Sequence, residues 1–170
     1  MADKINQSEC ETDDMEEIIR EYYDDIYKYC YWKIKNSTDA QDITQETFLR
    51  FIQNFVNYVD MGKPKALLYT IARNLCINWK RKPSYIPLEN IENDSSFIIS
   101  NELDTVIDKM YLHDAVSSLP LSQQEVLLLR YGQDLRVGEI ATILNISRFT
   151  VMYRLKCAIN ELNKMKIGED

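Results

Sequence analysis

Apolar side chains recur every third or fourth residue along most of the chain, and this spacing is the strongest constraint on its fold. In the first such stretch, about residues 15–34, the periodic positions include Ile18, Tyr22, Ile26 and Tyr29. Four glycines and four prolines are too few to supply the tight turns of a sheet built from hairpins. The sequence therefore predicts an all-α protein whose helices each bury one face.

Caps and prolines divide this pattern into separate helices. Residues 36–38 (Asn-Ser-Thr) offer a cap for a helix over about residues 39–54, and Pro64 suits the first turn of a helix over about 64–81. The acidic segment 83–101 then contains two prolines and no sustained helical period. This composition predicts a flexible acidic linker.

A second group of helices is expected after the linker. Ser122 and Glu125 have the spacing of a capping box ahead of an apolar run, and Gly132 suits a left-handed residue that ends a helix. The expected helices of this group cover about residues 102–117, 126–131, 137–144 and 148–165.

These elements predict two small helical domains joined by the linker. The first covers residues 15–82 and the second covers 102–166, with a helix-turn-helix in the second. Residues 1–14 are acidic and are expected to be a disordered N-terminus. Domains of this size bury modest cores, so each is expected to be marginally stable alone.

Several classes of protein are disfavoured by composition. The chain has no apolar run of about 18 residues and its N-terminus lacks the features of a secretory signal, so we expect a cytoplasmic protein without membrane insertion. Its four cysteines are widely spaced and its single histidine, His113, has no neighbouring cysteine, so we expect no metal site. His113 also lacks the partners of a catalytic residue, so we expect no enzyme activity, no catalytic residues and no cofactor.

Charge is strongly segregated although the net charge is −7. Residues 62–82 carry six bases and no acid, and residues 147–166 carry five bases and one acid, while residues 83–125 between them carry eight acids and one base. Two basic islands separated by an acidic stretch favour two contact surfaces for a polyanion, although solvated helix faces have the same pattern.

The last two expected helices carry the most specific pattern. A helix-turn-helix needs a small residue in its first helix, a residue that tolerates positive φ in the turn, and a branched apolar residue in the second helix. Ala141, Asn145 and Val151 meet these three demands. We expect Ser147 to cap the second helix, whose exposed side would face the major groove of DNA; a plain helical hairpin is the alternative.

Basic residues alternate with aromatic residues between residues 63 and 82. Cationic side chains bind phosphates, and flat rings such as Tyr69 and Trp79 stack on unpaired nucleobases, so this mixture favours binding of single-stranded DNA. The same two rings could equally belong to a helical core.

Four motifs in chain order resemble the extracytoplasmic-function (ECF) sigma factors of bacterial RNA polymerase. They are DAQDITQETF at residues 39–48, LYTIARN at 68–74, LPLSQQEVLLLRY at 119–131, and EIA at 139–141 followed by S-x-x-T-V-x-x-R-L at 147–155. The resemblance covers about residues 15–165. It implies an alternative sigma factor that binds core RNA polymerase and directs promoter recognition, melting and transcription initiation, with the two domains acting as regions 2 and 4.

The resemblance also implies a role for particular residues. The helix face of Asp39, Asp42, Gln45 and Glu46 would bind the clamp helices of the β′ subunit, and the helix at residues 127–131 would partly face the β flap. An anti-sigma factor is a further partner that the resemblance allows. The residues implied in capture of the minus-ten promoter element are Tyr58, Lys63, Lys65, Arg73, Asn74, Asn78, Lys80 and Arg81.

The second helix of the helix-turn-helix would read the minus-thirty-five element. The implied contact residues are Ser147, Arg148, Phe149, Thr150, Tyr153, Arg154 and Lys156. Met152, Cys157 and Ile159 stand where the family commonly has basic residues. This departure predicts weak duplex affinity or an unusual minus-thirty-five sequence, since fewer cations remain to hold phosphates.

Two alternative functions stay open. A one-component helix-turn-helix regulator would use residues 1–118 to bind a small molecule and residues 119–166 to bind DNA as a dimer. A polymerase-binding protein that docks through its first domain but does not melt promoters is the other.

Overall fold

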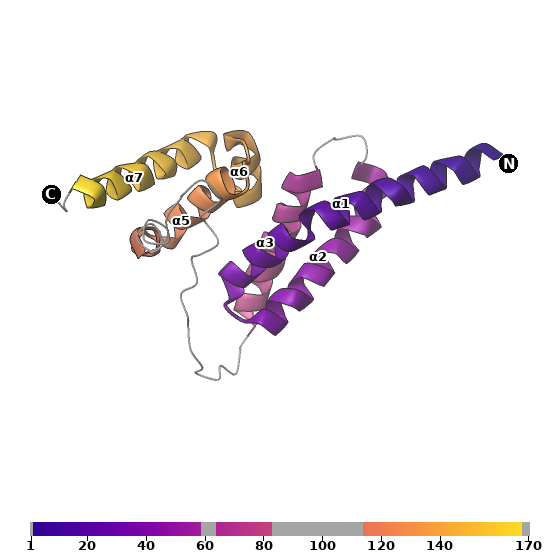
Figure 1. The fold of residues 1–170 in the computed structure, drawn as a ribbon, viewed down its shortest axis with the longest axis horizontal. Helices are drawn as coiled ribbons and strands as arrows, with labels where there is room; N and C mark the ends of the chain where they lie inside the picture. Colours follow the sequence, from indigo (N-terminus) through magenta and orange to yellow (C-terminus); the bar gives the residue numbers. More distant parts are fainter. Residues whose placement is uncertain (1, 59–63, 83–113, 168–170) are drawn as a thin grey trace. The chain divides into compact units, whose positions relative to one another are not determined.

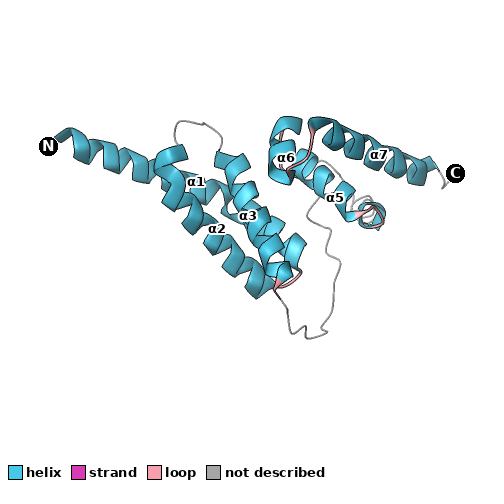
Figure 2. Cartoon of the chain, turned by 180° about the vertical axis from the view of Figure 1, so that it is seen from behind, coloured by secondary structure: helices cyan, strands magenta, loops and turns pink. Residues whose placement is uncertain are grey.

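The computed structural model describes the backbone of residues 2–58, 64–82 and 114–167, and the side chains of residues 15–54, 64–82 and 114–165. Within these ranges every regular element is a helix and no strand occurs (Figure 2), which confirms the all-α prediction. The chain divides into two units, Met1–Ile86 and Pro87–Asp170. The expected linker at residues 83–101 lies outside the described residues.

Three helices that pack against one another build the N-terminal unit (Figure 1): α1 (Ala2–Ile34), α2 (Ser37–Tyr58) and α3 (Pro64–Arg81). Fully buried side chains come from all three helices, namely Ile26, Tyr29, Phe51, Leu68 and Tyr69. Apolar residues at helical spacing thus supply a single core, as the periodicity predicts.

The turn between α1 and α2 depends on two polar residues. Lys35 adopts the left-handed conformation with φ 58°, and its backbone N–H donates to the carbonyl of Tyr31 at 2.8 Å. The side-chain oxygen of Asn36 accepts a hydrogen bond from the backbone N–H of Asp39 at 3.0 Å. Asn36 therefore satisfies one of the unpaired donors at the start of α2.

Residues 2–14 are helical, in contrast to the disordered N-terminus that their acidity predicts. They contain no glycine or proline, so nothing in this stretch breaks the helix before Met15. Acidic composition alone is therefore a poor guide to the start of α1.

The C-terminal unit contains a helical turn at residues 114–117, then α5 (Leu121–Leu127), η3 (Leu128–Gly132), α6 (Val137–Leu144) and α7 (Arg148–Ile167). The segment η3 is π-helical. The predicted bounds of α6 and the predicted start of α7 are confirmed.

The predicted capping box at Ser122 is wrong, because α5 begins earlier. Pro120 is its N-cap, and no side chain caps the helix there. Instead the buried amide of Gln124 donates hydrogen bonds to the carbonyls of Ser117 at 3.2 Å and Leu119 at 2.7 Å. These two hydrogen bonds connect the turn at Ser117–Pro120 to α5, and Ser122 lies inside the helix.

The predicted left-handed Gly132 is also wrong. Gly132 continues the π-helical segment, and the left-handed residue that follows is Asp134, with φ 50°. A Cβ at position 132 would lie 3.1 Å from the Leu128 side chain. Glycine is therefore suited to this position by close packing on Leu128 and not by its backbone conformation.

Candidate nucleic-acid interface

The turn between α6 and α7 has the geometry of a helix-turn-helix. Asn145 is left-handed with φ 53°, and the backbone N–H of Ile146 donates to the carbonyl of Ala141 at 3.0 Å. Ala141 is 8% exposed and Val151 is completely buried, so the two helices meet through these small and branched side chains. The roles predicted for Ala141, Asn145 and Val151 are confirmed.

Ser147 begins α7 as predicted. Its Oγ accepts a hydrogen bond from the backbone N–H of Thr150 at 3.1 Å and also lies 2.8 Å from the Thr150 Oγ1. These contacts satisfy one donor at the start of the helix. Because the two hydroxyls bond to each other, they orient the first turn of α7.

The outer face of α7 is rich in exposed side chains. Val151, Leu155 and Ala158 point into the unit and are at most 9% exposed, while Phe149 is 83% and Tyr153 69% exposed. Ser147, Arg148 and Lys156 are also exposed, and Thr150 and Arg154 are half-buried. All seven predicted minus-thirty-five residues are thus at least partly accessible, and most of them lie on one side of the helix.

Arg148 has a defined position that the sequence did not reveal. A Cβ built on Gly138 would lie 3.2 Å from a terminal nitrogen of Arg148 and 3.3 Å from its Nε. The guanidinium therefore rests against the first turn of α6. No specific signal in the sequence indicates this contact, because an isolated glycine in a helix does not identify its neighbour.

Polar residues of α3 form a second accessible surface. Asn74, Asn78, Lys80 and Arg81 are exposed, and Arg73 is half-buried. The half-buried Lys65 places its ammonium 5.7 Å from the centroid of the Tyr22 ring. Burial, followed by hydrogen bonding to Glu21, raises the pKa of Tyr22 to about 12, so this ring carries no charge near neutral pH.

Two predicted minus-ten residues cannot be placed on this surface. Tyr58 is the last residue of α2, but its side chain lies outside the described residues, as does the whole of Lys63.

Stacking of unpaired bases on Tyr69 is ruled out by its burial. The ring is fully buried and lies edge to face against Tyr29. Trp79 is half-buried near the end of α3. The aromatic residues between Lys63 and Lys82 therefore belong at least partly to the core, which was the alternative interpretation.

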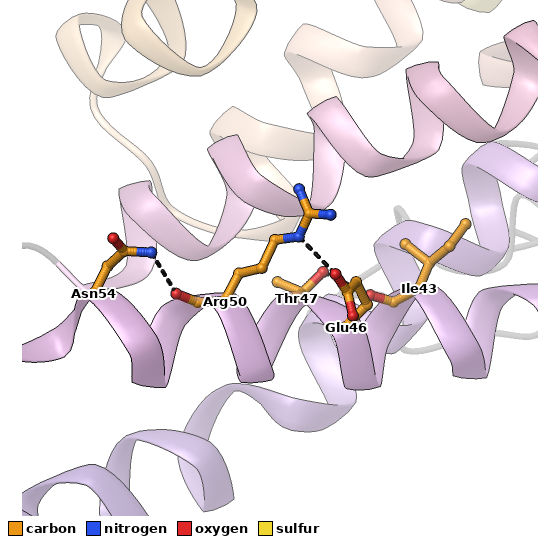
Figure 3. Close-up of polar contacts among 5 residues, drawn as sticks. All are labelled: Ile43, Glu46, Thr47, Arg50 and Asn54. Carbon is orange, nitrogen blue, oxygen red and sulfur yellow. Dashed lines mark hydrogen bonds and ion pairs between the residues drawn. The ribbon is translucent and has the colours of Figure 1, made fainter.

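The predicted polymerase-binding face lies on α2. Asp42 and Gln45 are exposed, whereas Asp39 and Glu46 are half-buried. Figure 3 shows that Glu46 is engaged within its own helix, since its carboxylate accepts a hydrogen bond from the Arg50 Nε at 2.7 Å. Asp39 and Asp42 therefore carry most of the negative charge that this face can offer a basic partner.

The segment predicted to face the β flap is largely a core element. Leu127, Leu128 and Leu129 are at most 4% exposed, while Tyr131 is 55% exposed and Arg130 is half-buried. These three leucines belong to the core of the unit. Of this segment, Arg130 and Tyr131 remain accessible.

A pair of buried thiols lies away from these surfaces. Cys30 of α1 and Cys76 of α3 are at most 1% exposed. Hydrogen bonding to Cys30, followed by burial, raises the pKa of the Cys76 thiol well above its usual value.

Among the described side chains, no group of three acidic, histidine or cysteine residues could hold a metal ion. In the same part of the chain, no helix is both long and apolar enough to cross a bilayer.

Comparison with known proteins identifies the family of this chain. Residues 18–84 match the family model of Sigma-70 region 2, and residues 109–162 match that of Sigma-70, region 4. The chain is 33% identical over 163 residues to the ECF RNA polymerase sigma factor SigW of Bacillus subtilis (strain 168), covering 87% of this chain and 86% of SigW. The chain belongs to the ECF RNA polymerase sigma factors. It is an alternative sigma factor that directs the initiation of transcription.

A further relative and two solved structures are similar to this sigma factor. ECF RNA polymerase sigma factor SigM of Bacillus subtilis is 30% identical over 162 residues, which cover 92% of this chain and 99% of SigM. The sigma factor RpoE from Bartonella quintana, solved with the anti-sigma factor NepR, has a TM-score of 0.69 at 18% identity and covers 92% of this chain and 99% of its own. CnrH, solved with the cytosolic domain of CnrY, has a TM-score of 0.64 at 14% identity, with complete coverage of both chains. These two structures have the fold of this sigma factor.

Proposed function

We propose that this sigma factor divides promoter recognition between its two units. The first domain, residues 15–82 of the N-terminal unit, binds the β′ clamp helices of core RNA polymerase through α2 and holds open the minus-ten element through α3. The second domain, residues 102–166 of the C-terminal unit, reads the minus-thirty-five element as duplex through α7. Residues 83–101 are the linker between the two domains. An anti-sigma factor is a further partner in this proposal.

The observation that best supports it is the distribution of charge over accessible faces. The accessible face of α2 offers Asp39 and Asp42, the exposed end of α3 offers Lys80 and Arg81, and the exposed N-terminal part of α7 offers Arg148. Binding to a basic protein surface requires an anionic face, and binding to the phosphates of DNA requires a cationic one. This sigma factor presents its anionic face on α2 and its cationic faces on α3 and α7.

The role of α2 is tested by titrating core polymerase with variants of the full chain. Asp42→Ala removes an exposed carboxylate from the proposed contact, whereas Gln41→Ala changes its exposed neighbour without removing charge. We expect Asp42→Ala to weaken core binding about tenfold to a hundredfold, the cost of a charged hydrogen bond at an interface, and Gln41→Ala to leave it unchanged. Equal affinities for the two variants would reject docking through this face.

The role of α3 is tested by the reactivity of unpaired thymines toward permanganate in promoter complexes of the holoenzyme. Replacing Lys80 and Arg81 together with Ala removes two exposed cations, and Lys28→Ala removes an exposed cation from α1 as the control. We expect the double variant to bind core polymerase normally but to lose most of the minus-ten reactivity. Unchanged opening in the double variant would reject the assignment to α3.

A further inference from the structure

An exposed apolar stripe runs along α7. Phe149, Met152 and Tyr153 are 83%, 56% and 69% exposed, and their spacing places them on one face of the helix. The opposite face is occupied by the buried Val151, Leu155 and Ala158. Large apolar side chains gathered in this way are typical of a surface that a partner covers.

The charges around the stripe indicate the chemistry of that partner. Residues 148–160 contain three bases, namely Arg148, Arg154 and Lys156, and no acid. The first acid of α7 is Glu161, which pairs with Lys164 at 2.8 Å. A partner that satisfies both the cations and the apolar side chains must combine anionic groups with apolar ones.

The major groove of duplex DNA meets both conditions. Its phosphates neutralise the cations, and the C5-methyl group of each thymine is its main apolar feature. Phenylalanine and methionine have no pair of donors for guanine and no acceptor for cytosine, so they distinguish bases through contact with that methyl group. Phe149 lies in the first turn of α7, where the second helix of a helix-turn-helix contacts base edges.

Resting on the proposed function, we propose that Phe149 and Met152 determine specificity by contacting thymine methyl groups in the minus-thirty-five element. The element then carries thymine at one or two positions facing this stripe. Arg148, Arg154 and Lys156 hold the backbone and contribute affinity that does not depend on sequence.

The test replaces single thymines with deoxyuridine, which removes the methyl group and keeps every hydrogen-bonding group. Holoenzyme made with the full chain is titrated with promoter duplexes that carry uracil at each thymine of the minus-thirty-five element in turn. We expect one or two positions at which uracil weakens binding about fourfold, the ratio expected for one buried methyl group.

Variants assign each methyl contact to a side chain. At the sensitive position, Phe149→Ala or Met152→Ala is expected to bind thymine and uracil duplexes equally, because the partner of the methyl group is gone. Leu121→Ala, which removes another exposed apolar side chain from the same unit, is the matched control and keeps the fourfold difference.

Several results overturn the inference. The inference is wrong if uracil does not weaken binding at any position. It is also wrong if the preference for thymine over uracil persists in both Phe149→Ala and Met152→Ala. A loss of core binding without DNA in these variants would mean that a protein covers the stripe. Binding that is indifferent to scrambling of the whole minus-thirty-five element would instead reject the proposed role of α7 itself.

Discussion

The rings of Tyr29 in α1 and Tyr69 in α3 meet edge to face, with centroids 5.2 Å apart and planes at 82°. Both rings are fully buried, so this contact joins two helices at the centre of the N-terminal unit. The Tyr69 hydroxyl is buried as well and has no hydrogen-bond partner among the described residues. The Tyr69 hydroxyl is therefore an unsatisfied polar group in the core of this unit.

Tyr69→Phe is expected to stabilise the N-terminal unit by about 1 kcal/mol, because it removes a buried unpaired hydroxyl and keeps the ring contact. Urea unfolding followed by tryptophan fluorescence measures this change, since Trp32 and Trp79, the two tryptophans of the chain, both lie in this unit. Tyr29→Phe, which also keeps the ring, is the comparison. A loss of stability in Tyr69→Phe would mean that the hydroxyl has a partner.

Stability is expected to fall at alkaline pH, and Tyr69 contributes to the fall. Burial raises the pKa of Tyr69 well above its usual value, so the folded unit keeps a proton that the unfolded chain releases. Below the unfolded pKa of about 10 this pKa difference does not change stability. Above it, the free energy of unfolding falls with rising pH, because the unfolded chain ionises while the folded unit stays protonated. Urea unfolding repeated from neutral pH to pH 11 should show a shallower decline for Tyr69→Phe than for the unsubstituted chain. Identical pH profiles would contradict this.

Glycine and alanine at position 145, in the turn of the helix-turn-helix, should have different effects on the stability of the C-terminal unit. Asn145 has φ 53°, a conformation that costs most residues with a Cβ about 1–2 kcal/mol but that glycine and asparagine adopt readily. We expect Asn145→Ala to lower the free energy of unfolding by about 1 kcal/mol and Asn145→Gly to leave it nearly unchanged. Circular dichroism reports the loss, while tryptophan fluorescence, which reports the other unit, should not move. Equal stability of the two variants would show that the turn relaxes.

Gly138→Ala is expected to stabilise the C-terminal unit by about 0.5–1 kcal/mol, because alanine is the better helix former. The added Cβ would meet the terminal atoms of Arg148 at 3.2 Å, and this exposed, flexible side chain can withdraw. Thermal unfolding followed by circular dichroism measures the gain. A lower midpoint would mean that Arg148 is held firmly against α6.

The thiols should differ in reactivity. Cys157 is half-buried on α7, whereas Cys30 and Cys76 are at most 1% exposed. In a Cys10→Ser background, we expect one thiol to react readily with an aromatic disulfide reagent and two to react on the order of a thousandfold more slowly, because they need local unfolding. Urea should abolish the difference. Three fast thiols in the native protein would contradict the burial of this pair.

Local rules predicted most of the elements that present the candidate surfaces. The bounds of α6 and α3 and the left-handed Asn145 follow from caps, prolines and conformational preference, which act within a few residues. The same rules failed at Pro120–Ser122 and at Gly132, because the amide of Gln124 and the side chain of Leu128 decide these places through contacts across turns. Burial of Tyr69 and of Leu127–Leu129 depends on how helices pack, which periodicity alone does not reveal.

In-vitro transcription tests the central claim most directly. Core RNA polymerase is supplied with this chain and a fragmented bacterial genomic library, and transcript starts are mapped. The account predicts discrete starts with shared upstream elements, which disappear when Lys80 and Arg81 are replaced with Ala and persist in Lys28→Ala. Tight binding to core polymerase without discrete starts would contradict it and point to a polymerase-binding protein that does not melt promoters, and failure to bind core polymerase would point to a one-component regulator.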